Sequence, residues 1–258
     1  MSKRLSEEVR RPMDNLRYSW SSPQEDEFAL LALGAPSPYE ALLVPSRMRH
    51  ARELLDFNSL PVEDQNRWSA TFTYFLKLLA VQQGKPMILK SPPHGYRMGV
   101  LQRRFPEARY IVIERNPYEV FASNLKLWQI LTERYSLERC SGEELEEFIL
   151  SAFILHEKAV ENGSQQVRPG FLAFVRYEEL EREPIEQITR IYRTLNLNDF
   201  EVARPRMEEY LGKVSGHRRN RFTLSLQQKK RVEGRWGRYI SEKGYGWPEE
   251  YIDLKGDQ

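Results

Sequence analysis

The sequence predicts an α/β fold built around a parallel sheet. Residues 86–90 and 109–114 are apolar runs with the composition of buried strands, and residues 96–105 between them repeat apolar side chains at helical spacing. A strand, a helix and a second strand in this order form a βαβ unit, in which the two strands run parallel. Residues 170–177, GFLAFVRY, predict a third strand of the same sheet.

The flanking segments predict helices with recognisable ends. Pro61 begins a helix with one aromatic and aliphatic face, which Gly84 ends after residue 83. Residues 141–144, SGEE, form a capping-box pattern that opens a helix running to about Gly163. Another helix follows Pro184. We therefore expect helices to cover the predicted sheet.

The length allows one α/β domain or two small ones, and one domain is the simplest expectation because the sequence has no internal repeat and no convincing linker. The 258 residues suffice for a single α/β domain over 1–258, with a polar N-terminal segment at 1–23 and a basic, aromatic tail at 215–258. The 39 Lys and Arg nearly balance the 37 Asp and Glu, so the net charge of +2 does not suggest a nucleic-acid partner. We expect no metal ion, because the four histidines are scattered and Cys140 is the single cysteine.

The sequence also indicates a cellular location. It has no apolar stretch of about 18 residues, so we expect no membrane span. Residues 1–15 lack the apolar core of a signal peptide. We therefore expect a cytoplasmic protein.

Polar side chains stand at the carboxyl ends of the three predicted strands, which is where open α/β sheets bind ligands. Lys90 ends the first strand, Arg115 follows the second and Tyr177 ends the third. Asn116 is a suitable cap for a helix that begins at Pro117. Two cations beside a helix N-terminus predict an anion site, for phosphate or sulfate.

Further residues could serve this site. Ser123, two helical turns after Arg115, could donate its hydroxyl to a bound phosphate. His94 could act as a general base near neutral pH. The acidic run 25–27 is open to two interpretations, a favourable charge at a helix start or part of the site. The basic segments 217–222 and 227–239 form either a solvated tail or a flap over an anionic ligand.

The motifs together resemble sulfotransferases that use 3′-phosphoadenosine 5′-phosphosulfate (PAPS), especially their bacterial branch. LKSPPH, RNP-x₅-S and RYEEL-x₃-P carry the resemblance by their order and spacing, because each alone is common. The similarity extends almost end to end. It covers RPMDN from Arg11, SPQEDEFALLALGAPSPY from Ser22, ILKSPPH from Ile88, FPEARYIVIERNPYEVFAS from Phe105, VRYEELEREP from Val175 and RWGRYISEKGYGW from Arg235.

The resemblance implies a P-loop NTPase-like α/β sandwich of three layers around a parallel sheet, and roles for single residues. Arg115 and Ser123 match the pair that holds the 3′-phosphate of PAPS, and Tyr177 matches a tyrosine near the nucleotide. Lys90 matches a lysine that stabilises the bridging oxygen and the sulfuryl group. Ser91, which follows it, is expected to bind PAPS.

The base and the C-terminal contact are assigned in the same way. His94 resembles a histidine that serves as base in many members, although its spacing from the lysine differs, and Glu27 is the alternative base, with its neighbours at 25 and 26 also candidates. Arg231 lies in a segment similar to the one that closes over the 3′-phosphate.

One departure concerns the start of the chain. The family begins with a strand and a glycine-rich loop that cradles the 5′-phosphosulfate, whereas the first glycine here is Gly34. The resemblance therefore implies an N-terminally incomplete, truncated member, in which a partner chain or an oligomer could cover the missing strand.

The expected activity follows. It is transfer of a sulfuryl group from PAPS to a hydroxyl or amine on a small molecule, a saccharide or a peptide, which releases 3′-phosphoadenosine 5′-phosphate. The alternative is a non-catalytic chain that binds a nucleotide or another anion. The sequence does not identify the acceptor.

Overall fold

The computed structural model describes residues 9–10, 17–19, 22–214 and 219–255. Their contacts divide the chain into two compact units that alternate along the sequence. The first unit comprises residues 1–97 and 124–157, and the second comprises 98–123 and 158–258. The prediction of one domain stays a prediction, and each unit is considered by itself. The RPMDN motif at 11–15 and His217 lie outside the described residues.

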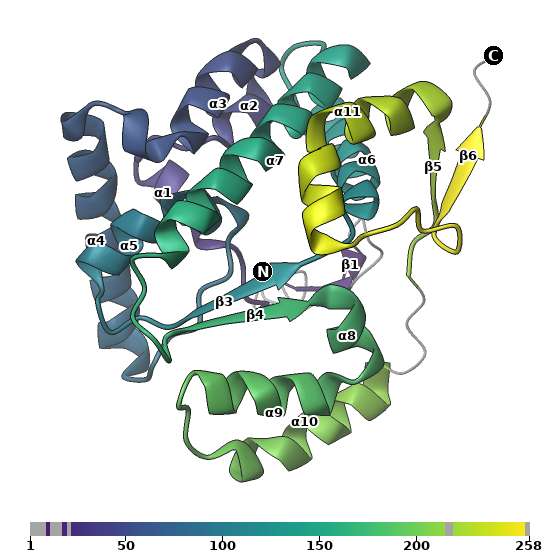
Figure 1. The fold of residues 1–258 in the computed structure, drawn as a ribbon. Helices are drawn as coiled ribbons and strands as arrows, with labels where there is room; N and C mark the ends of the chain where they lie inside the picture. Colours follow the sequence, from purple (N-terminus) through teal and green to yellow (C-terminus); the bar gives the residue numbers. More distant parts are fainter. Residues whose placement is uncertain (1–8, 11–16, 20–21, 215–218, 256–258) are drawn as a thin grey trace. The chain divides into compact units, whose positions relative to one another are not determined.

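The first unit is mainly helical (Figure 1). Its elements are β1 (Val9–Arg10), β2 (Arg17–Tyr18), α1 (Asp26–Ala32), α2 (Glu40–Leu43), the 3-10 turn at Pro45–Arg47, α3 (Met48–Leu55), the 3-10 turn at Phe57–Ser59, α4 (Val62–Gln83), the 3-10 helix η4 (Pro92–Arg97), and the larger parts of α6 (Pro117–Tyr135) and α7 (Gly142–Ser164).

The predicted helix boundaries of this unit are confirmed. Gly84 ends α4 in the left-handed region at φ 61°, a conformation that glycine adopts without steric cost. Ser141 and Glu144 exchange the hydrogen bonds of a capping box at the start of α7. Trp68 and Phe72, one turn apart on α4, are buried and stacked with 4.9 Å between ring centroids. The aromatic face of α4 is therefore core.

The second unit contains the parallel strands (Figure 1). Its elements are α5 (Met98–Arg104), β3 (Tyr110–Glu114), the start of α6, the end of α7, β4 (Leu172–Arg176), α8 (Tyr177–Arg182), α9 (Pro184–Thr194), α10 (Phe200–Val214), β5 (Phe222–Ser225), α11 (Leu226–Lys243) and β6 (Ile252–Lys255).

Strands β3 and β4 confirm the parallel pairing, with Tyr110 opposite Leu172 and Glu114 opposite Arg176. Helix α9 packs on β4 through a core of Ala173, Val175, Ile191 and Leu195. Successive side chains of a strand point to opposite faces, so this core takes alternate residues of β4. The pairing places the residues that follow the two strands, Arg115 and Tyr177, at the same edge of the sheet.

The predicted strand at 86–90 is wrong. These residues have no regular secondary structure, and Ile88 is 98% exposed. A strand needs a neighbour to receive its backbone hydrogen bonds, and within the described ranges no strand pairs with this segment. Apolar composition favours burial, but burial of a strand also depends on partners that lie far away in sequence. Lys90 therefore does not end a strand.

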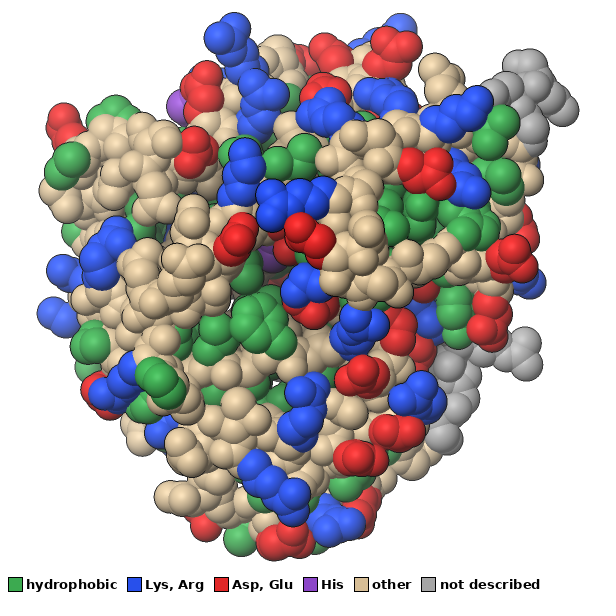
Figure 2. Space-filling model, viewed as in Figure 1, with side chains coloured by type: hydrophobic (Ala, Val, Ile, Leu, Met, Phe, Trp, Pro, Cys, Tyr) green, Lys and Arg blue, Asp and Glu red, His purple; other side chains and the backbone are tan. Residues whose placement is uncertain are grey.

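The C-terminal segment is more ordered than a solvated tail. Strand β5 precedes α11 in the chain and β6 follows it, and the two strands pair in parallel. The N-terminus of α11 carries a capping box between Ser225 and Gln228. Val232 and Trp236, one turn apart on α11, are buried. Figure 2 shows basic side chains interspersed with acidic ones on the face in view, which agrees with the near balance of charges.

Candidate active site

Three consecutive acidic residues at the start of α1 each pair with a basic residue of segment 90–97. The pairs are Glu25 with Lys90, Asp26 with His94, and Glu27 with Arg97. All six residues belong to the first unit. From the sequence, the acidic run could be a helix start or part of a site. In the structure, the acidic run pairs with residues in and just after the LKSPPH motif. The sequence alone did not reveal this pairing.

The pair of Glu27 and Arg97 is a buried anchor. Arg97 donates to both oxygens of Glu27 at 2.6 and 3.0 Å, and the Ser37 hydroxyl donates to Glu27 at 2.7 Å. The Arg97 guanidinium lies 4.4 Å from the centre of the Trp68 ring, within cation–π range. Both carboxylate oxygens of Glu27 are therefore occupied. The role of Glu27 as alternative base stays a prediction.

Lys90 is exposed and pairs with Glu25, whose other oxygen accepts a hydrogen bond of 2.6 Å from the Tyr39 hydroxyl. Burial, together with the nearby Glu25 carboxylate, raises the pKa of Tyr39 far above its ordinary value, so its phenol stays protonated. Glu25 thus accepts from a fixed phenol on one side and contacts a solvent-exposed ammonium on the other.

His94 packs against Asp26 and Phe72. The His94 Nε2 and Asp26 Oδ2 atoms lie 2.9 Å apart, and the edge of the imidazole meets the Phe72 ring at 5.5 Å between centroids. The contact is close but not aligned as a straight hydrogen bond. The Ser91 carbonyl accepts a hydrogen bond from the backbone N–H of His94 at 3.0 Å, and the Ser91 hydroxyl is buried without a partner among the described residues.

Arg115 belongs to a cluster in the second unit. Its guanidinium donates twice to Oε2 of Glu119, at 3.1 and 2.7 Å, and lies 4.3 Å from the centre of the Tyr177 ring. The structure therefore brings together Arg115 and Tyr177, which the sequence predicted for one site. Ser123, on α6, and Arg231, on α11, are half-buried members of the same unit.

Arg219 is a member of this cluster that no sequence motif singled out. Its guanidinium contacts the same Glu119 oxygen as Arg115, pairs with Glu181 at 3.1 Å and lies 3.7 Å from the centre of the Tyr251 ring. Burial opposes its charge, but the neighbouring carboxylates, Glu119 first among them, outweigh burial, so the pKa of Arg219 is raised. In the sequence, Arg219 is one of several arginines in the basic run 217–222, and the run does not indicate which of them is buried.

Asn116 fixes the backbone beside Arg115. Its side-chain oxygen accepts from the backbone N–H of Tyr118 at 3.1 Å, which confirms the predicted cap of α6. Its side-chain amide donates to the carbonyl of Gly246 at 2.8 Å, and its backbone N–H donates to Glu178 at 2.8 Å. The start of α6 is thereby bound to α8 and to the segment between α11 and β6.

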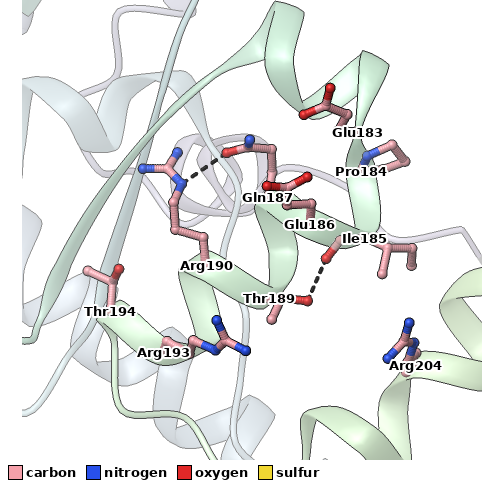
Figure 3. A pocket seen from close by; sticks show the side chains of 10 residues that line it. All are labelled: Glu183, Pro184, Ile185, Glu186, Gln187, Thr189, Arg190, Arg193, Thr194 and Arg204. Carbon is pink, nitrogen blue, oxygen red and sulfur yellow. Dashed lines mark hydrogen bonds between the residues drawn. The ribbon is translucent and has the colours of Figure 1, made fainter.

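A separate hollow lies between α9 and α10 (Figure 3). Two of its arginines are engaged with neighbours: Arg190 donates to Gln187 at 2.9 Å, and Arg204 pairs with Glu208 at 2.9 Å. None of the site residues predicted from the sequence lines it, and we assign it no part in the chemistry. Its lining residues are Glu183, Pro184, Ile185, Glu186, Gln187, Thr189, Arg190, Arg193, Thr194 and Arg204.

Metal-binding groups and membrane-spanning helices are both absent from the part of the chain that the structure describes. There, no three or more His, Cys, Asp or Glu side chains are grouped in a way that could hold a metal ion. Among the same residues, no helix has the length and apolar character needed to cross a membrane.

Comparison with known proteins agrees with the resemblance. The sequence model of the Sulfotransferase family matches residues 9–201. Omega-hydroxy-beta-dihydromenaquinone-9 sulfotransferase Stf3 from Mycobacterium bovis and that from Mycobacterium tuberculosis are each 33% identical over 235 residues, which cover 91% of this chain and 61% of theirs. This chain therefore spans about three-fifths of the length of these relatives.

A solved structure shares the fold. Sulfotransferase STF9 from Mycobacterium avium superposes with a TM-score of 0.67 at 21% identity, covering 92% of this chain and 58% of that one. This match confirms the fold class predicted from the sequence. The family model matches most of the chain, and the chain therefore belongs to the sulfotransferase family.

Proposed function

We propose that this protein transfers a sulfuryl group from PAPS to a hydroxyl or amine acceptor. The observation that carries the proposal is the family match over 9–201, a range that contains Lys90, His94, Arg115, Ser123 and Tyr177. The relatives named Stf3 act, by their name, on an omega-hydroxylated menaquinone. A terminal hydroxyl on a long apolar chain is therefore the first acceptor class to test.

The residues present fit an anionic nucleotide. A guanidinium matches the oxygens of a phosphate monoester, and the face of Arg115 lies on the Tyr177 ring. Its Nε and Nη2 atoms donate to Glu119, so an incoming phosphate would share or replace that contact. In the first unit, the exposed ammonium of Lys90 and the buried hydroxyl of Ser91, unpartnered among the described residues, are adjacent in sequence. We assign the Arg115 cluster to the 3′-phosphate, with Ser123 and Arg231 as further donors, and Lys90 with Ser91 to the sulfuryl end.

The proposed transfer is an in-line displacement. PAPS supplies a sulfuryl group bound to a phosphate leaving group. His94 removes the proton of the acceptor hydroxyl as the acceptor oxygen forms its bond to sulfur. The bond from sulfur to the bridging oxygen breaks, and its electron pair remains on the phosphate, where the Lys90 ammonium offsets the growing charge. General-base catalysis of this kind contributes about 10²–10⁴-fold.

The test is release of 3′-phosphoadenosine 5′-phosphate from PAPS in the presence of an omega-hydroxylated menaquinone, simple alcohols, amines, saccharides and a tyrosine-containing peptide. We expect turnover with at least one acceptor and a loss of about 10²–10³-fold in Lys90→Ala, the range typical when a charge-stabilising donor is removed. Lys85→Ala, at an exposed lysine five residues upstream, is the matched control and should retain the rate.

Two results would oppose the proposal in different ways. Absence of turnover, together with no thermal stabilisation by the product nucleotide, would refute both the proposed transfer and PAPS as its donor. Stabilisation by the nucleotide that is lost in Arg115→Ala, without turnover for any acceptor, would instead leave the non-catalytic nucleotide-binding alternative.

A further inference from the structure

Asp26 is a buried carboxylate whose nearest basic partner is His94. The side chains of Asp26 and His94 are only 5% and 15% exposed, and their Oδ2 and Nε2 atoms are 2.9 Å apart. Neither Asp26 oxygen receives a hydrogen bond from any described residue. A buried carboxylate costs free energy unless a positive charge or hydrogen bonds compensate it. The imidazole is thus the group that can compensate Asp26, and it does so best when it carries a second proton and a positive charge.

The neighbouring pairs fix the relative position of Asp26 and His94. Glu27 and Arg97 lock one side with two hydrogen bonds, and Glu25 contacts Lys90 on the other. Successive residues of the helix start are therefore matched to successive basic residues of segment 90–97. The Phe72 ring packs against the imidazole in a T-shaped contact, with 5.5 Å between ring centroids.

The acidic residues on either side of Asp26 have basic partners of their own. Glu25, the N-cap of α1, faces Lys90, and Glu27, on α1, faces Arg97. The contact of His94 with α4 is the uncharged ring of Phe72. His94 is therefore the basic partner of Asp26.

We propose that Asp26 is the positioning residue for His94. It orients the imidazole and stabilises the imidazolium that forms when His94 takes the proton of the acceptor hydroxyl. Asp26 itself stays ionised: the proton leaves the acceptor oxygen, ends on a ring nitrogen of His94 and is later lost to solvent. The catalytic consequence rests on the proposed function, whereas the pairing of the two side chains does not.

The first experiment measures the pairing without activity. The ring ¹⁵N resonances of His94, assigned by comparison with His94→Gln, are followed in the whole chain and in Asp26→Asn. We expect Asp26→Asn to shift the His94 ring resonances. The control is Glu53→Gln, which removes the partner of His50 at 3.5 Å in the same unit. It should leave the His94 resonances unchanged. Unchanged His94 resonances in a folded Asp26→Asn protein would overturn the proposal.

The second experiment separates orientation from folding. With the wild-type protein active, Asp26→Asn should lower kcat about 10–100-fold with the KM for PAPS within about twofold, because the orienting group acts through the base. Asp26→Glu should restore part of the rate, and Glu53→Gln should not alter it.

The two arms distinguish their failures. Altered His94 resonances in a protein that shows no turnover would retain the pairing and refute the proposed transfer. Full activity in folded Asp26→Asn would refute the positioning role while leaving the transfer intact. An equal loss in Glu53→Gln would also refute it, since that loss would reflect histidine pairing in general.

Discussion

Removal of the Glu27 carboxylate should strongly destabilise the protein. Glu27 and Arg97 are 0% and 2% exposed, and Glu27→Ala leaves the guanidinium buried without a counter-charge. Breaking a buried ion pair by removing one partner costs about 3–5 kcal/mol. In a chain of this size each kcal/mol lowers the melting temperature by roughly 2–4 °C. We therefore expect a fall of roughly 6–20 °C.

The assays are thermal unfolding, for the melting temperature, and urea unfolding, for the free energy, both followed by circular dichroism with Glu53→Ala as control. Glu53 pairs with Arg49 at 3.7 Å in an exposed position, where an ion pair contributes about 0–1 kcal/mol. Replacement of both anchor residues, Glu27→Leu with Arg97→Met, should recover much of the loss, because no charge is then left buried. A cost below about 1 kcal/mol for Glu27→Ala would refute the anchor, since a loss that small is typical of an exposed ion pair.

Three further predictions concern other parts of the molecule. Arg115→Lys should weaken binding of 3′-phosphoadenosine 5′-phosphate about tenfold or more by calorimetry, while 5′-AMP binding changes little, because a lysine cannot replace the two-pronged contact; equal losses for both nucleotides would contradict this. Gly95→Ala should cost about 1–3 kcal/mol in urea unfolding, since its Cβ would lie 2.1 Å from Nε2 of His156, and His156→Ala should relieve the strain. Burial raises the pKa of Tyr110 to about 12, above the ordinary value near 10, so the stability it contributes is complete below about pH 10 and is lost between about pH 10 and 12. Tyr110→Phe should flatten the fall of unfolding free energy over that range, and an unchanged slope would contradict the shift.

Elements with local signals were predictable from the sequence. Gly84 at the end of α4, the capping box at Ser141 and the cap at Asn116 all depend on residues within a few positions of one another. The parallel pairing of β3 with β4 followed from the helices between them, which exclude a hairpin. The helix ends have causes that the sequence carries within one segment, whereas the pairing of β3 with β4 followed from the order of elements along the chain.

Elements with distant partners were not predictable. The run 86–90 has the composition of a strand, yet Ile88 is 98% exposed. Composition does not show whether a neighbouring strand is present to pair with the run, and none of the described strands does so. The contact of Glu27 with Arg97 joins residues 70 positions apart, and that of Arg219 with Glu119 joins residues 100 apart. A single sequence gives no register for such pairs, so it shows Arg219 only as part of a basic run.

The three acidic residues at the start of α1 differ in what their burial allows. Exposure of their side chains rises from 0% at Glu27 to 5% at Asp26 and 23% at Glu25, and their partners Arg97, His94 and Lys90 follow at 2%, 15% and 77%. A fully buried pair cannot exchange its partner without a large cost, whereas an exposed pair contributes about 0–1 kcal/mol and exchanges readily.

The increase in side-chain exposure from Glu27 to Glu25 therefore distinguishes a structural pair from the pairs with a proposed chemical role, all within one helical turn. The inner pair anchors the segment, the middle pair holds an imidazole against a carboxylate, and the outer pair leaves an ammonium that an anionic ligand can take over from Glu25. If that is correct, Glu25→Gln should bind the product nucleotide more tightly than the wild type, because Lys90 no longer has to give up a carboxylate. Weaker binding in Glu25→Gln, measured by calorimetry, would instead mean that the carboxylate is needed to hold the ammonium in place.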